Sequence, residues 1–273
     1  SKISLYLRIA SYSVLAFTLA FLINNVLTVW SDWPGVKKIF SHYEMFGFKK
    51  KALEGSALNY GFMQIGVYLI CIVAVIIYVF KTYSQTLERD SEILSNFSAY
   101  LVRSSFWAVF LVGVADFIIS FMVVERLWEA IFSPEVKAFM VKSPERITFI
   151  HFPIILISFV IGYFTKSVGF IWLAVLVVVS EFIIVLSRFI FSYEQAFQGD
   201  LVRFWYAALY LFASAYALIH EGHVRVDVLY SSFSERKKAW TNLLGSALLG
   251  VPLVLIVLFL GLNGKASIIN GPV

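Results

Sequence analysis

Four uncharged, largely apolar stretches constrain the fold of this chain more than any other feature of its sequence. They cover residues 9–31, 55–80, 147–165 and 239–264. A helix needs about 20 such residues to cross a hydrocarbon core of roughly 30 Å, because it rises about 1.5 Å per residue. Each stretch therefore predicts a membrane-spanning helix.

Three further apolar stretches are interrupted by charge and cover residues 95–124, 168–191 and 204–219. The last is short but can be extended back through Arg203. Together with the uncharged stretches, they predict an all-α, polytopic integral membrane protein with about seven transmembrane helices.

The composition excludes a soluble globular domain. Hydrophobic residues make up 60% of the chain and charged residues 14%, whereas soluble domains have roughly 45–50% and about 25%. The single cysteine, Cys71, cannot form an intramolecular disulfide. The net charge of +5 is modest and its basic residues are scattered, which disfavours nucleic-acid binding.

Four charged residues fall inside predicted spans, where each costs roughly 2.5–3.5 kcal/mol on insertion scales. Glu181 and Arg188 are seven residues apart and share nearly one helical face, which is too far for a direct contact; a residue from a neighbouring helix, such as Asp116 or Arg103, could bridge them. We expect an intramembrane charge network that fixes helix packing or contacts a partner subunit. The alternative is an ion or proton pathway in a stand-alone channel or transporter.

A cluster of His220, His223 and Asp227 suggests a second alternative, a membrane-embedded metal enzyme. The two histidines are one residue too close for a zincin motif, and Gly222 between them favours the end of a helix. No catalytic motif occurs elsewhere in the sequence. We therefore expect no catalytic residues, no bound metal and no cofactor in this chain, and interpret the cluster as polar groups at the headgroup boundary.

The segments between the spans differ in character. Residues 33–51 form a polar stretch with aromatics throughout, long enough for a short interfacial helix. Residues 81–94, which are rich in charge, predict a solvated linker.

From about residue 168 onward, three sequence features carry a resemblance to a known family. They are Asp200-Leu201-Val202-Arg203, the small-residue patch Phe212-Ala213-Ser214-Ala215-Tyr216-Ala217-Leu218, and Gly222-His223-Val224-Arg225-Val226-Asp227-Val228-Leu229. This part of the chain resembles the small membrane subunit of TRAP transporters, the DctQ family. The basic run Glu235-Arg236-Lys237-Lys238 before the last span fits the same pattern.

Each group of residues that carries the resemblance is expected to have a structural role. Ala213 and Ala215 would permit close helix approach. Asp200 and Arg203, three residues apart, can pair at the start of a helix. His223, Arg225 and Asp227 would tie the end of that helix to the headgroup layer or to a partner.

The resemblance suggests two parts: residues 167–273 form a DctQ-like domain, and residues 1–166 an N-terminal extension of about four transmembrane helices. The family usually has four helices, whereas three are expected between residue 168 and Val273. We leave open whether a fourth follows. The role of the extension is equally open.

The resemblance implies a non-catalytic scaffold subunit in a sodium-coupled transporter for organic acids. A large membrane subunit (DctM-like) would carry the substrate and sodium sites and move as an elevator. A periplasmic substrate-binding protein (DctP-like) would deliver the substrate, and the small subunit would help to dock it. Lipids are further expected partners, and the expected location is the bacterial inner membrane. The transported substrate is not indicated by the sequence.

Orientation rests on the basic residues. Arg225, Arg236, Lys237 and Lys238 follow the sixth predicted span and favour a cytoplasmic loop, which places the N-terminus in the cytoplasm. The Lys49–Lys51 run favours the opposite orientation. We follow the first group because it agrees with the resemblance. The first span is expected to be retained, since no small-residue cleavage site follows it.

Overall fold

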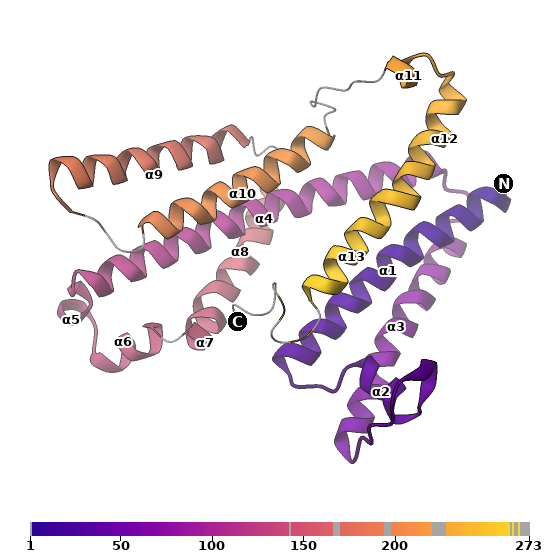
Figure 1. Ribbon diagram of the computed structural model, residues 1–273, viewed down its shortest axis with the longest axis horizontal. Helices are drawn as coiled ribbons and strands as arrows, with labels where there is room; N and C mark the ends of the chain where they lie inside the picture. The colour runs from indigo at the N-terminus through magenta and orange to yellow at the C-terminus, as the bar shows by residue number, and fades with distance from the viewer. Residues whose placement is uncertain are drawn as a thin grey trace. The chain divides into compact units, whose positions relative to one another are not determined.

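The computed structural model describes residues 2–141, 143–165, 170–193, 198–219, 228–262, 264 and 267. Within these residues the chain consists of helices and turns and contains no strand, which confirms the all-α prediction (Figure 1). In chain order the elements are α1 (Lys2–Trp30), α2 (Val36–His42), η1 (Met45–Gly47), α3 (Ser56–Lys81), α4 (Leu87–Val124), α5 (Leu127–Ile131), α6 (Pro134–Val141), α7 (Ser143–Arg146), η2 (Ile147–His151), α8 (Phe152–Phe164), α9 (Phe170–Ile190), α10 (Gln198–Ile219), α11 (Val228–Ser231), α12 (Glu235–Gly245), η3 (Ser246–Gly250) and α13 (Val251–Gly261).

Among the described residues, five helical segments are long and apolar enough to cross a membrane. They are Ile3–Trp30, Ser56–Lys81, Leu87–Val124, Ile147–Phe164 and Glu235–Gly261. Four coincide with the uncharged stretches, and Leu87–Val124 contains the predicted span at 95–124. The two remaining predicted spans fall on α9 and α10, helices of 21 and 22 residues that are not among the five. The membrane prediction is confirmed, whereas the count of seven stays a prediction.

Two of the spanning helices contain a widened π turn, and a proline accounts for each. Proline has no backbone N–H and its ring crowds the carbonyl of the preceding turn, so the helix must widen there. The π segment η2 ends two residues before Pro153, and η3 ends two residues before Pro252. Residues 147–164 and 235–261 therefore continue as single spans despite their prolines.

The chain divides into two compact units. The first contains Ser1–Ser91 together with Asp227–Val273, and the second contains Glu92–Val226. The region predicted to resemble DctQ contributes helices to both: α9 and α10 to the second unit, α12 and α13 to the first. These units are defined by contacts. The proposed division at residue 166 concerns sequence resemblance and stays a prediction.

The first unit is built on the pairing of α1 with α3, which lie side by side in Figure 1. Ala16 of α1 and Val75 and Val79 of α3 are buried between the two helices. The α13 helix joins this unit through Phe259, whose ring contacts the rings of Phe17 and Phe21 on α1. Most other large apolar side chains of these helices are exposed, as expected where lipid replaces water.

The second unit packs α9 and α10 against one another and against α4. Val177 of α9 and Leu201, Val202 and Trp205 of α10 form its buried cluster. Gly113 of α4 leaves room for Trp205, because a Cβ at that glycine would lie 2.8 Å from the indole nitrogen. The helices predicted at 168–191 and 204–219 are confirmed as α9 and α10. The α10 helix begins at Gln198, six residues before the predicted start.

The predicted solvated linker at 81–94 is wrong for most of its length. Only Thr82–Thr86 separate the two helices, since α4 begins at Leu87. The Thr86 hydroxyl accepts a hydrogen bond from the backbone N–H of Arg89 (3.2 Å), which caps the helix. Glu88 and Asp90 in the first turn favour the same end, because carboxylates stabilise helix N-termini. Glu88 and Asp90, which were predicted to lie in the solvated linker, therefore stabilise the first turn of α4.

Candidate functional site

The most deeply buried charges of the described chain are Arg8 on α1 and Asp90 in the first turn of α4. They are 2% and 4% exposed, and Arg8 Nε donates to Asp90 Oδ2 at 2.5 Å. Arg8 also donates to the carbonyl and the hydroxyl of Thr82, each at 2.7 Å. The guanidinium therefore joins α1 to the end of α3 and the start of α4.

The carboxylate of Asp90 is satisfied by further donors. The Tyr12 hydroxyl donates to Oδ1 at 3.0 Å, and Gln85 Nε2 donates to the same oxygen at 2.7 Å. A buried ion pair tolerates its loss of hydration only when its remaining hydrogen-bonding capacity is used in this way. The cluster of Arg8, Asp90, Tyr12, Thr82 and Gln85, here termed the Arg8–Asp90 cluster, is thus built as a helix joint.

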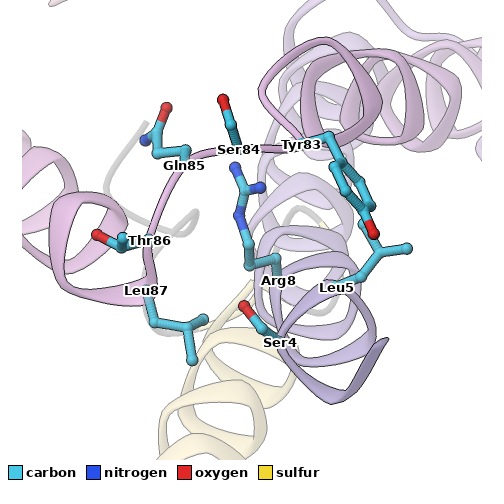
Figure 2. A pocket seen from close by; sticks show the side chains of 8 residues that line it. All are labelled: Ser4, Leu5, Arg8, Tyr83, Ser84, Gln85, Thr86 and Leu87. Atoms are coloured by element: carbon cyan, nitrogen blue, oxygen red, sulfur yellow. The ribbon is translucent and has the colours of Figure 1, made fainter. Parts of the chain in front are cut away.

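A pocket of about 410 Å³ adjoins this cluster. It is lined by Ser4, Leu5, Arg8, Tyr83, Ser84, Gln85, Thr86 and Leu87. Figure 2 shows the Arg8 side chain extending from α1 toward the turn that carries Ser84 and Gln85. The pocket offers hydroxyl and amide groups to a polar molecule. It offers little net charge, because Asp90 already neutralises Arg8.

A second polar cluster lies in the other unit and centres on Asp116 of α4. Its Oδ1 lies 2.9 Å from His151 Nε2 and 3.6 Å from Arg146 Nε. All three side chains are partly buried. His151 belongs to the π turn η2, so the widened turn before Pro153 presents this histidine to α4. The cluster joins α4 to the segment that leads into α8.

The structure does not bring together the four residues of the predicted intramembrane network. Arg103 donates to the carbonyl of Gly162 at 3.3 Å, and Asp116 is occupied by His151. Glu181 and Arg188 of α9 are exposed and form no ion pair with any other described residue. The sequence pattern could not identify Gly162 and His151 as the partners of Arg103 and Asp116, because they lie in segments distant from α4 in the sequence.

Asp200 and Arg203 pair at the first turns of α10, as predicted, with Arg203 Nη1 3.5 Å from Asp200 Oδ1. Their side chains are 66% and 85% exposed. The intervening residues Leu201 and Val202 are buried, so the helix packs through one side and leaves this pair on the other. The pair is therefore accessible to another molecule.

The remaining residues singled out by the resemblance cannot be placed in the same detail. Ala213 and Ala215 lie on α10, but their side chains are outside those described. His223, Arg225 and Asp227 lie outside the described residues altogether. The same holds for His220, and hence for the proposed metal cluster. Within the described ranges, no group of three or more histidine, cysteine or acidic side chains could hold a metal ion.

Two polar contacts of the second unit lie outside the five spans. The Tyr193 hydroxyl donates to the Glu125 carboxylate, which raises the pKa of Tyr193 and joins the ends of α9 and α4. Lys137 donates to Glu129 at 2.7 Å, and this contact lowers the pKa of the Glu129 carboxyl. Both contacts are exposed and join neighbouring segments at the surface.

Sequence reasoning missed the Arg8–Asp90 cluster completely. Arg8 lies one residue before the span predicted at 9–31, and Asp90 lies within the linker predicted at 81–94. One signal was present: a lone arginine at the start of an apolar helix needs a counter-charge, and an acid-rich helix start follows the next span. The pairing itself depends on α1 and α3 lying side by side.

These features define a class of protein: a helical membrane protein in which buried charges join helices. Residues 174–271 match the family model described as "Tripartite ATP-independent periplasmic transporters, DctQ component". Over these residues the chain is similar to the small membrane component of TRAP transporters, which agrees with the resemblance seen in its sequence. The match begins within α9 and extends beyond α13. No curated protein and no solved structure matches the chain.

Proposed function

We propose that this chain is a non-transporting scaffold subunit that braces a separate, large membrane subunit of a TRAP transporter. The observation that carries the proposal is the match of residues 174–271 to the DctQ component. In this proposal the large subunit binds and moves the substrate, and the present chain fixes its position in the membrane.

The exposed charges of the matched region support a partner in the membrane. Glu181 and Arg188 project from α9, a helix with otherwise almost wholly apolar side chains. Charged groups facing hydrocarbon are costly, so a helix that carries two of them needs polar groups from another polypeptide. Asp200 and Arg203 on α10 are likewise exposed. These four residues are the proposed contact points for the large subunit.

The buried charges support the scaffold role. Asp90 and Asp116, the two acidic residues buried or partly buried in α4, are engaged with the guanidinium groups of Arg8 and Arg146, respectively. A cation-coupled transport site needs carboxylates or carbonyls that are free to exchange ligands. We therefore assign the sodium and substrate sites to the large subunit, and assign these carboxylates to helix packing.

The finer features of the proposal follow from the resemblance. They are coupling to sodium, an organic acid as substrate, docking of a periplasmic binding protein and a location in the bacterial inner membrane. His223, Arg225 and Asp227 would contribute to docking or assembly. We expect substitution of Arg225 or Asp227 to weaken assembly without changing which substrate is transported.

Co-purification tests the proposal. The chain carries an affinity tag and is expressed with a candidate large membrane subunit of a TRAP transporter, and the complex is extracted in mild detergent. We expect the two polypeptides to elute together in fixed proportion. A chain that elutes alone, and that still supports full uptake after reconstitution alone, would overturn the proposal.

The variant Glu181→Gln/Arg188→Gln sharpens this experiment, because it removes both exposed charges of α9. We expect it to recover less of the large subunit. A matched control is Glu129→Gln/Lys137→Gln, which removes one acid and one base from an exposed pair outside residues 174–271. Equal recovery from both variants would exclude α9 from the contact.

A further inference from the structure

The segment between α1 and α3, residues 33–55, forms a folded cap at the end of this helix pair (Figure 1). The Ile39 side chain of α2 is 2% exposed and occupies the space beside Gly61 of α3. The fully buried Gln64 of α3 accepts a hydrogen bond from the Gly35 backbone at 2.8 Å. Trp33 stacks on Tyr60 with ring centroids 4.7 Å apart. The cap is thus fastened to α3 at three points.

The two lysine-bearing parts of the cap are held beside one another. The backbone N–H of Lys51 donates to the Ser41 carbonyl of α2 at 3.2 Å, and that of Leu53 donates to His42 Nδ1 at 2.9 Å. Lys37 lies over the ring of Phe48, with its Nζ 5.9 Å from the centroid. These contacts place the Lys37–Lys38 pair next to the Lys49–Lys51 run.

The resulting surface is strongly basic. All five lysines (Lys37, Lys38, Lys49, Lys50 and Lys51) are exposed. The segment contains two acidic residues, Glu44 and Glu54, and among the described residues only Lys50 is in an ion pair, with Glu44 at 3.5 Å. The cap therefore carries uncompensated positive charge directly at the ends of two membrane spans.

Apolar side chains project from the same cap. Phe46 is 78% exposed, and Tyr43 and Met45 are about half exposed. Phe46 has φ of 54°, in the left-handed region that bulky residues rarely occupy. The backbone thus holds a large aromatic ring outside the protein in a conformation that costs free energy. Lysines combined with exposed aromatic tips are typical of surfaces that lie in the headgroup layer of a membrane.

We propose that the cap at residues 33–55 binds the phosphate headgroups of anionic phospholipids, with Phe46 inserted among the acyl chains beneath them. Its position supports lipid over other anions: Trp30 ends one span and Ser56 begins the next, so the cap lies at headgroup depth by construction. The inference gives the N-terminal extension a role, and it does not depend on assembly with a large subunit.

Lipid selectivity of the purified full chain tests the proposal. The chain in neutral detergent is mixed with equal amounts of phosphatidylglycerol and phosphatidylcholine of the same acyl chains, and retained lipid is measured by native mass spectrometry. We expect preferential retention of phosphatidylglycerol that weakens with added salt. Equal retention of the two lipids would overturn the proposal.

Two variants with equal loss of charge locate the site. Lys49→Gln/Lys50→Gln should lower the preference for phosphatidylglycerol by about fivefold or more, since one lysine near an anionic surface accounts for about fivefold and Lys50 is already paired with Glu44. Arg236→Gln/Lys237→Gln removes two exposed charges at the start of another span and should leave the preference unchanged. Equal effects would show a general attraction to the whole chain and contradict a site in the cap. Unchanged thermal unfolding of both variants confirms that the fold is retained.

A fluorescent label tests the insertion of Phe46. The label is attached to Phe46→Cys in a Cys71→Ala background, since Cys71 is the only native cysteine, and the chain is placed in nanodiscs of phosphatidylglycerol and phosphatidylcholine. We expect strong quenching by lipids with a nitroxide high on the acyl chain. Absence of quenching would contradict the insertion of this side chain among the acyl chains.

Discussion

Two ion pairs of this chain consist of the same side chains in opposite surroundings. Arg8 and Asp90 are almost completely buried and share their hydrogen bonds with Tyr12, Thr82 and Gln85. Asp200 and Arg203 are largely exposed at the start of α10. An exposed pair contributes roughly 0–1 kcal/mol to stability, whereas removing one partner of a buried pair costs about 3–5 kcal/mol. The first pair therefore holds the fold, and the second leaves its charges available to a partner.

The largest effect is expected from breaking the buried pair. Arg8→Met leaves Asp90 buried without a counter-charge, so we expect a loss of about 3–5 kcal/mol in the free energy of unfolding. Thermal unfolding in detergent measures it. The double variant Arg8→Met/Asp90→Asn should recover much of the loss, because the uncompensated charge is gone. If the single variant unfolds like the native chain, the cluster is not a helix joint.

A somewhat smaller effect is expected at Gly162, where α8 lies close to α4. A Cβ at Gly162 would lie 2.9 Å from the backbone N and Cα of Ser104. Gly162→Ala should therefore cost about 1–3 kcal/mol through overpacking. Gly66→Ala on α3 is the control, since nothing lies within 4 Å of its Cβ position, and it should be neutral or stabilising by up to about 1 kcal/mol. The two changes in unfolding midpoint should have opposite signs or clearly different sizes.

The exposed pair should behave in the reverse way. Asp200→Asn/Arg203→Gln should change the free energy of unfolding by no more than about 1 kcal/mol, yet lower recovery of the large subunit in co-purification. Thermal unfolding and recovery of the large subunit are measured on the same preparation, so that the effects on stability and on assembly can be compared directly. A large loss of stability with unchanged recovery would place this pair in the same category as Arg8 and Asp90.

The smallest effect concerns Glu129 and its pH dependence. The hydrogen bond and charge of Lys137 lower the pKa of Glu129 in the folded chain. A depressed carboxyl pKa adds stability above the pKa of the unfolded chain, and that stability is lost as pH falls through the folded pKa. The difference in unfolding midpoint between the native chain and Glu129→Gln should be slight near neutral pH and narrow in acid. A difference that widens in acid would contradict the assignment.

Hydrophobic length was enough to predict the helices. The uncharged stretches at 9–31, 55–80, 147–165 and 239–264 all coincide with helices that are long and apolar enough to cross a bilayer, because its thickness sets the length of apolar helix required. The helices at 147–164 and 235–261 also continue past their internal prolines. Pattern could not predict the end of the linker at residues 81–94, where the Thr86 cap and two acidic residues extend α4 by eight residues.

Pairings between helices were beyond sequence reasoning. Asp116 was expected near Glu181 and Arg188 but contacts His151, and Arg8 pairs with a residue 82 positions away. Such contacts depend on which helices pack together, and spacing along the chain does not encode that choice. The local pair of Asp200 and Arg203 was predictable because a single helix sets its geometry.

The central claim, that this chain supports transport without carrying the cargo, is tested most directly by flux measurements in proteoliposomes. The chain is reconstituted alone and together with the large subunit and binding protein, and sodium-dependent uptake of organic acids is measured. We predict uptake by the complete set and none by this chain alone. Robust flux through the isolated chain, abolished by Glu181→Gln, would contradict the account and assign a transport path to its own helices.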